Sequence, residues 1–139
     1  MSTHLINLTP HDVAIYKRGA SEPALVIPSS GALRLAIYPQ KELNPFMHGF
    51  GEQMEVAVPV LTPQMFRGLD DTTVGWRVWK NNPHGAFVVS MATAQFLVEN
   101  RIECDVGSRQ VYCPASDPDH GKRDKNGVLE GVYAIERYV

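Results

Sequence analysis

The sequence predicts an α+β fold, mostly antiparallel β, with one principal helix at about 90–101 and a short helical turn near 62–68. Short runs of β-branched and aromatic residues recur along the chain, which is typical of strands. Ten prolines and eleven glycines are spread between these runs as turn residues. At 139 residues the chain has the length of one ordinary domain, so we expect a single domain over 1–139.

The strand-like runs are distributed over most of the chain. They lie at residues 4–8, 13–17, 25–28, 33–38, 54–60, 75–79 and 86–90. Pro59 falls inside one of these runs. Because proline has no N–H to donate to a neighbouring strand, this run is predicted to be an edge strand or to contain a bulge. Near the C-terminus, Asn126-Gly127 stands between a polar and an apolar run and predicts a hairpin with a type I′ turn.

Two segments carry helix signals. In the first, Thr62 is a candidate N-cap, Pro63 takes the first helical position and Gly68 ends the turn. In the second, Ser90 is a candidate N-cap, and the apolar residues that follow recur at helical spacing up to Arg101. The second segment is longer and predicts the principal helix.

Composition excludes several classes of partner. The formal net charge is −2 and the sequence pI is about 6.2, so the chain lacks the basic field that binding to a nucleic-acid duplex requires. No run of 18 apolar residues is present to span a membrane, and the start of the sequence lacks the pattern of a signal peptide. We therefore expect a cytoplasmic protein in which Cys104 and Cys113 are reduced.

The sequence contains no complete motif for metal binding or catalysis. Cys104, Cys113 and His120 lack the spacing and the fourth ligand of a zinc site, so no metal and no cofactor are expected. No Gly-x-Ser-x-Gly elbow and no phosphate-cradling glycine loop is found. The remaining candidates are arginines, which match phosphate oxygens, and aromatic rings such as Phe87, which stack on bases. Residue chemistry alone indicates a binding module.

The stretch "LTPH" near the N-terminus admits two interpretations. Pro10 fixes its own φ and restricts Thr9 to extended conformations, so the segment bends without becoming helical. The Thr9 hydroxyl and the His11 imidazole can then hydrogen-bond backbone groups at the bend, or they can contact a ligand. The structural interpretation is favoured because a bent strand must satisfy its backbone groups.

Five motifs follow one another in a characteristic order. They are "INLTPHDVAIY", "IPSSGALRLAI", "FVVSMATAQ", "CDV" with a proline shortly after it, and "KRDKNGVLEGV". In this order they resemble a family of small phage and prophage proteins with an N-terminal Leu-Thr-Pro-His motif, over nearly the whole chain. The sequence departs from that pattern by a long segment between "SSG" and "FVVS" and by extra residues in "YCPASDPDHGK".

The resemblance implies a function. Some proteins of this kind are anti-Thoeris sponges, which sequester a cyclic ADP-ribose isomer made by a bacterial TIR defence enzyme without degrading it. The expected ligand is thus a small cyclic nucleotide, the expected setting is the host cytoplasm, and a homo-oligomer, a dimer or higher, is implied. Two alternatives stay open: a small phage enzyme that cleaves or modifies a nucleotide, and a structural or host-interaction protein without a small ligand.

The resemblance also suggests roles for individual residues. Arg123 is expected to bind a phosphate, with Asp124 orienting it or contacting a ribose hydroxyl. Phe87 is the candidate for stacking on adenine. Ser90 would cap a helix whose N-terminus faces an anion, and Arg101 is a second candidate phosphate ligand. With Thr9 and His11, these residues make up the predicted ligand site.

Overall fold

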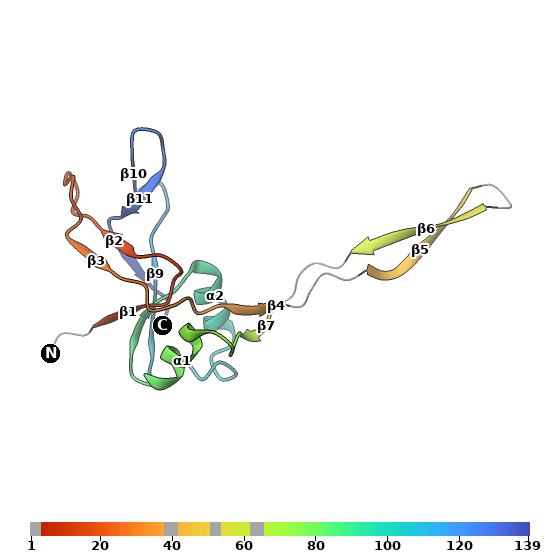
Figure 1. Cartoon of the computed structure of the whole chain (residues 1–139), viewed down its shortest axis with the longest axis horizontal. Coiled ribbons are helices and arrows are strands. Elements are labelled where there is room, and N and C mark those ends of the chain that lie inside the picture. Colours follow the sequence, from red (N-terminus) through yellow and green to blue (C-terminus); the bar gives the residue numbers. More distant parts are fainter. Residues whose placement is uncertain (1–3, 38–41, 51–53, 62–65) are drawn as a thin grey trace. The chain divides into compact units, whose positions relative to one another are not determined.

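The computed structural model describes residues 4–37, 42–50, 54–61 and 66–139, and it confirms an α+β fold made mostly of strands (Figure 1). The chain divides into two compact units. Unit 1 comprises Met1–Arg34 and Leu69–Val139, and unit 2 comprises Leu35–Gly68. This division adds a boundary that the single-domain prediction did not include.

Unit 2 consists of short two-stranded sheets. Strands β5 (Glu42–Phe50) and β6 (Met54–Leu61) form an antiparallel pair, and β4 (Leu35–Ile37) pairs with β7 (Phe66–Leu69). Pro59 lies in β6, which among the described residues pairs with β5 alone, so the prediction of an edge strand is confirmed. The predicted helical turn near 62–68 is wrong from residue 66 onward, where β7 begins, and residues 62–65 lie outside the described part.

Unit 1 contains two four-stranded sheets. Sheet A has the order β1-β8-β9-β12 and sheet B has the order β10-β11-β2-β3. The strands of sheet A are β1 (Leu5–Asn7), β8 (Ala86–Val88), β9 (Gln110–Pro114) and β12 (Ile135–Arg137). The strands of sheet B are β10 (Gly121–Arg123), β11 (Leu129–Val132), β2 (Val13–Ile15) and β3 (Leu25–Ile27). Among the strand pairs with a described register, the antiparallel ones outnumber the parallel ones.

Helix α2 (Met91–Glu99) confirms the predicted principal helix, although it ends two residues earlier. It begins as predicted, because the Ser90 Oγ accepts a hydrogen bond from the backbone N–H of Thr93 at 3.4 Å. The helix connects β8 to β9, which are parallel neighbours in sheet A. Such a crossover is the usual way to join two parallel strands.

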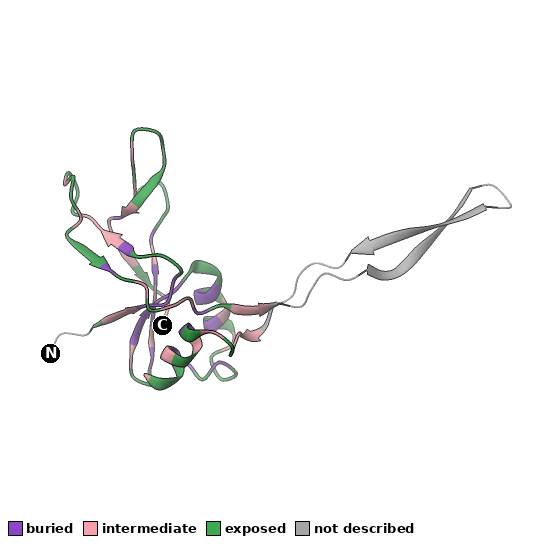
Figure 2. Ribbon diagram, viewed as in Figure 1, coloured by how far each residue is buried: buried purple, intermediate pink, exposed green. Residues whose placement is uncertain are grey.

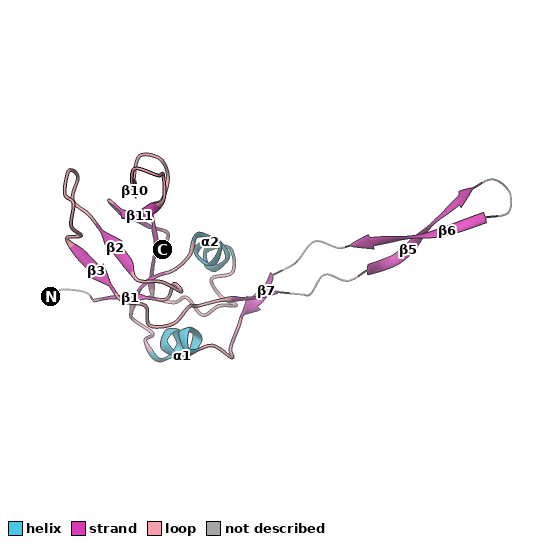
Figure 3. Ribbon diagram, turned by 45° about the horizontal axis from the view of Figure 1, so that its top comes forward, coloured by secondary structure: helices cyan, strands magenta, loops and turns pink. Residues whose placement is uncertain are grey.

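A second helix, α1 (Val74–Asn81), replaces the strand predicted at 75–79 and corrects the expectation of one principal helix (Figure 3). The run of tryptophan and valine suggested a strand by composition, but Thr73 caps a helix here, since its Oγ1 accepts from the Trp76 N–H at 3.1 Å. The buried residues Gly75 and Trp79 are four positions apart and so lie on one helical face.

The core of unit 1 is centred on β8, which is buried on both faces (Figure 2). Phe87 packs in one cluster with residues of both helices, including Trp79 of α1 and Leu97 of α2. The next residue, Val88, packs in a second cluster with Val13 and other residues of sheet B. Because neighbouring side chains of a strand point to opposite faces, sheet A lies between the helices and sheet B.

Arg109, one of the arginines of the C-terminal third, is a structural residue. It is 5% exposed, and its Nε and Nη2 donate to the Trp79 carbonyl at 3.1 and 2.9 Å. Nη2 also donates to the Lys80 carbonyl at 3.3 Å, and Nη1 donates to the Asp105 carbonyl. The guanidinium carbon lies 4.8 Å from the centre of the Trp79 ring. Arg109 thus satisfies carbonyls at the C-terminus of α1.

The β10–β11 hairpin is present as predicted, but its turn is not type I′. That turn requires positive φ at both central residues, and Asp105 is the only non-glycine residue with positive φ in the described part of the chain. Instead, Gly127 has φ +80° and donates to the Asp124 carbonyl at 3.0 Å. The Asp124 carboxylate accepts from the N–H groups of Asn126 and Val128 at 2.8 and 3.0 Å. Asp124 therefore fixes a three-residue loop that ends in a left-handed glycine.

The segment 35–68 leaves unit 1 and returns to it at one place. The N–H of Asp70 donates to the carbonyl of Arg34 at 2.8 Å, so the last residue before the segment and the second residue after it are hydrogen-bonded neighbours. Unit 2 is therefore an insertion into a continuous unit 1.

Candidate ligand-binding cavity

The "LTPH" bend is built around the side chain of Asn7, which is fully buried. Its Nδ2 donates to the carbonyls of His11 and Ile27 at 2.8 and 2.9 Å, and its Oδ1 accepts from the N–H of Thr9 at 2.9 Å. The Thr9 Oγ1 lies 2.6 Å from this Oδ1 and 2.8 Å from the His11 carbonyl. The structural interpretation is confirmed for Thr9, whereas His11 contributes its backbone carbonyl and keeps its side chain exposed.

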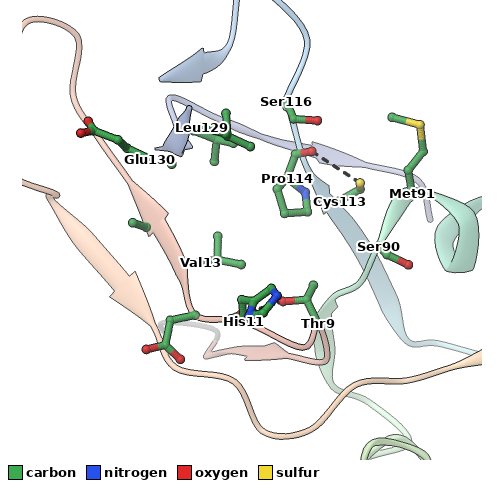
Figure 4. A pocket seen from close by; sticks show the side chains of 14 residues that line it. Thr9, His11, Val13, Ser90, Met91, Cys113, Pro114, Ser116, Leu129 and Glu130 are labelled. Carbon is green, nitrogen blue, oxygen red and sulfur yellow. Dashed lines mark hydrogen bonds between the residues drawn. The ribbon is translucent and has the colours of Figure 1, made fainter. Parts of the chain in front are cut away.

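A cavity of about 460 Å³ opens beside this bend in unit 1 (Figure 4). It is formed by the bend, the start of β2, the whole of β11, the end of β9 with the residues just after it, and the start of α2. The residues that line it are Thr9, His11, Asp12, Val13, Ala14, Ser90, Met91, Cys113, Pro114, Ser116, Leu129, Glu130, Gly131 and Val132. Most of the lining is apolar, with a few polar groups among it.

The cavity brings together three of the predicted site residues. Thr9 and His11 come from the bend, and Ser90 comes from the cap of α2, far away in the sequence. In Figure 4, the His11 ring lies next to Thr9, and Val13 stands between His11 and Pro114. The parallel pairing of β1 with β8 accounts for this meeting, because it places the ends of both strands side by side.

Phe87 is not available for stacking. Its side chain is 0% exposed, and its ring centroid lies 4.8 Å from that of Trp79 inside the core. The prediction that Phe87 stacks on adenine is wrong, because both faces of β8 are covered. Arg101 lies elsewhere on the surface, in a shallow pocket that Ile102, Asp105 and Gly107 also line.

Arg123 and Asp124 lie beside the cavity but do not line it. Arg123 is exposed, and its Nη1 donates to the Gly127 carbonyl at 2.9 Å. Its cross-strand partner is Leu129, which does line the cavity. Asp124 uses its carboxylate in the hairpin loop, so its observed role is to shape the turn.

Sequence reasoning missed both charged residues of the lining, Asp12 and Glu130. The Asp12 Oδ1 accepts from the N–H of Ser29 at 2.9 Å. Glu130 forms an ion pair with Lys122, whose Nζ also lies 4.7 Å from the centre of the Tyr16 ring. Both carboxylates lie within motifs of the family resemblance, but no residue pattern marks either of them as a site residue. Their place at the cavity depends on the pairing of β11 with β2, which local sequence does not reveal.

Cys113 contributes a buried thiol to the cavity wall. It is 4% exposed, and burial raises its pKa from 9.0 to about 11, with a smaller contribution from the negative charge of Glu136. At neutral pH the group is therefore a thiol rather than a nucleophilic thiolate. Cys104 is a second free and buried cysteine, and it packs in the core with the helices.

The raised pKa predicts a loss of stability in alkali. Below pH 9 the thiol is protonated in both the folded and unfolded states, so its ionisation does not lower the free energy of unfolding there. Between pH 9 and about 11 the unfolded thiol ionises first, so the free energy of unfolding falls by about 2 to 3 kcal/mol. Urea unfolding at several pH values should show a steeper fall in the wild type than in Cys113→Ala. An equal fall in the free energy of unfolding for both proteins would contradict the raised pKa of Cys113.

An exposed histidine–serine pair lies outside the lining of the cavity. The His84 Nδ1 lies 2.6 Å from the Ser108 Oγ, and this hydroxyl also lies 3.2 Å from the Pro83 carbonyl. Which of the two groups receives the hydroxyl proton depends on the tautomer of His84, so these contacts assign no catalytic role to the pair.

Comparison of the chain with protein-family models, with curated proteins and with solved structures found no match in any of the three. Neither helix of the described part has the length and apolar character needed to cross a membrane. Within the same residues, no group of three or more histidine, cysteine, aspartate or glutamate side chains could hold a metal ion.

Proposed function

We propose that the protein binds a small cyclic nucleotide signal of the cyclic ADP-ribose type and holds it without degrading it. The observation that carries this proposal is the cavity at which Thr9, His11 and Ser90 meet. Its volume of about 460 Å³ falls within the range of small-molecule sites, which runs from about 300 to 1,000 Å³. Such sites combine apolar walls with a few polar groups, as this cavity does.

The protonated state of the Cys113 thiol supports binding of the ligand rather than its chemical conversion. Cys113 is protonated at neutral pH because burial raises its pKa to about 11. A sponge acts by mass action, so it needs only affinity and abundance, and a mostly apolar cavity serves affinity by removing water from the ligand.

The family resemblance supplies the biological setting of the proposal. In that setting the protein is phage-encoded, acts in the host cytoplasm, and blocks an anti-phage defence by removing its signal. A homo-oligomer is part of the same proposal. Helix α2 and the turn after it expose Met91, Val98 and Ile102 at 49%, 39% and 91%, and this apolar surface is available to a second copy.

A depletion-and-release experiment tests the function. Purified protein is incubated with the products of a Thoeris TIR enzyme, the free nucleotide is quantified after filtration, and the retained protein is heated and assayed again. We expect the nucleotide to disappear and to return intact. Altered products would establish an enzyme instead, and a nucleotide that never leaves solution would contradict the proposal.

His11→Ala is expected to weaken binding of cyclic ADP-ribose by about tenfold, which corresponds to the loss of one hydrogen bond. The fold should be unaffected, because the interactions of His11 with the bend use its backbone carbonyl. Isothermal titration calorimetry measures the change. His4→Ala is the matched control, since His4 is also exposed but does not line the cavity. Equal affinities of the two variants for cyclic ADP-ribose would show that the His11 side chain does not contact the ligand.

A further inference from the structure

Apart from His11, the charged residues of the cavity lining are acidic. Its lining includes the carboxylates of Asp12 and Glu130, and no lysine or arginine lies among the lining residues as the structure describes them. Lys122 is close by, but it is engaged in the ion pair with Glu130 and lies over Tyr16. The two phosphates of a cyclic ADP-ribose would therefore meet acidic groups here without a partner cation.

Placing phosphates in such a cavity is unfavourable for two reasons. A charge that leaves water loses its hydration, and a partner of opposite sign is needed to compensate for this loss. In addition, the Asp12 carboxylate repels a phosphate, whereas the negative charge of Glu130 is paired with Lys122. In Figure 4, the carboxylate of Glu130 lies on the side away from Cys113 and Met91.

The remaining lining fits the uncharged part of a nucleotide. Val13, Pro114, Leu129 and Met91 provide apolar surface from three strands and a helix start. A nucleobase is flat and largely apolar on its faces, so its burial between such walls is favourable. The Asp12 carboxylate can accept a hydrogen bond from a ribose hydroxyl, a pairing that is common in nucleotide-binding proteins.

Resting on the proposed function, we infer that the cavity takes the nucleoside part of its ligand and leaves the phosphates in solvent at its mouth. Recognition then depends on the base and the ribose hydroxyls. Two consequences follow: the neutral nucleoside binds by itself, and the binding of cyclic ADP-ribose does not weaken as ionic strength rises, because no phosphate is paired with a cation of the lining.

Direct titrations with three probes test this inference. Adenosine, cyclic ADP-ribose and inorganic pyrophosphate are each titrated into the full chain by calorimetry, at low and high salt. We expect adenosine to bind within about tenfold of cyclic ADP-ribose, and pyrophosphate not to bind. Binding of cyclic ADP-ribose without adenosine would overturn the inference and leave the proposed function standing. Binding of adenosine alone would overturn the proposed ligand, and absence of all binding would overturn both.

The substitution Glu130→Gln tests separately how the phosphates and the nucleoside part of the ligand contribute to binding. Removing this charge should strengthen the binding of cyclic ADP-ribose by about three- to tenfold at low salt and leave adenosine within about twofold. Glu22→Gln is the control, because Glu22 is exposed and lies outside the lining, and it removes the same charge. An equal change for both ligands, or no change for cyclic ADP-ribose, would contradict the proposed place of the phosphates.

Discussion

Arg109→Ala is expected to lower the free energy of unfolding of unit 1 by about 3 to 5 kcal/mol. The substitution removes the guanidinium that donates to the carbonyls of Trp79, Lys80 and Asp105. Among the described residues, it leaves the buried Trp79 carbonyl with only the N–H of Asn82 as a donor, at 3.3 Å. It also removes the guanidinium from the face of the Trp79 ring. The loss of these hydrogen bonds, which are made by a charged group, adds to the loss of packing of a side chain that is 5% exposed, and the contributions are not fully additive.

Chemical denaturation followed by tryptophan fluorescence measures this loss. Arg109→Lys should recover only part of it, because an ammonium group cannot reach several carbonyls at once as the planar guanidinium does. Arg101→Ala is the matched control, since Arg101 is exposed, and it should change stability by less than about 0.5 kcal/mol. Equal effects of Arg109→Ala and Arg101→Ala would show that the buried contacts contribute nothing.

Gly75→Ala is expected to destabilise unit 1 by about 3 kcal/mol or more. A Cβ at this position would lie 2.2 Å from the carbonyl oxygen of Ala32 and 2.7 Å from the backbone nitrogen of Leu33. Both are backbone atoms, so α1 as a whole must move to make room. Helix propensity alone predicts the opposite sign, because alanine favours a helix interior by about 1 kcal/mol over glycine.

The sign of the change in the free energy of unfolding therefore decides whether the steric overlap of the new Cβ or the higher helix propensity of alanine dominates. Thermal and urea unfolding should both show a clear loss for Gly75→Ala. Arg77→Ala, in the same helix but at an exposed position, should be neutral within about 0.5 kcal/mol. A stability equal to or above that of the wild type would mean that the contact with residues 32 and 33 is not as close as described.

Much of the fold could be predicted because its signals are local. Ser90 caps α2 through a bond to Thr93, three residues away, and the hairpin forms around Asn126 and Gly127 within one short loop. Helix α1 was missed because its tryptophans and valines resemble a strand in composition. The cap at Thr73 and the spacing of Gly75 and Trp79 were the signals that could have identified it.

The site was harder to predict because it depends on pairings between distant segments. The sequence shows that Phe87 belongs to a strand, but not that helices cover one face of this strand and sheet B the other. Likewise, the sequence favours Arg123 as a ligand residue because of its guanidinium and gives no sign that Leu129 lies at the site. Only the register of the strands shows that Leu129 lines the cavity while Arg123 lies next to it.

The hydrogen bond between Arg34 and Asp70 has a consequence for how the chain tolerates change in length. Because the segment 35–68 leaves and re-enters unit 1 at one point, its own length enters the stability of unit 1 chiefly through the entropy of closing a loop. That entropy grows with the logarithm of length, by about 0.6 kcal/mol for each doubling. Additions within the segment 35–68 are therefore compatible with the same cavity in unit 1.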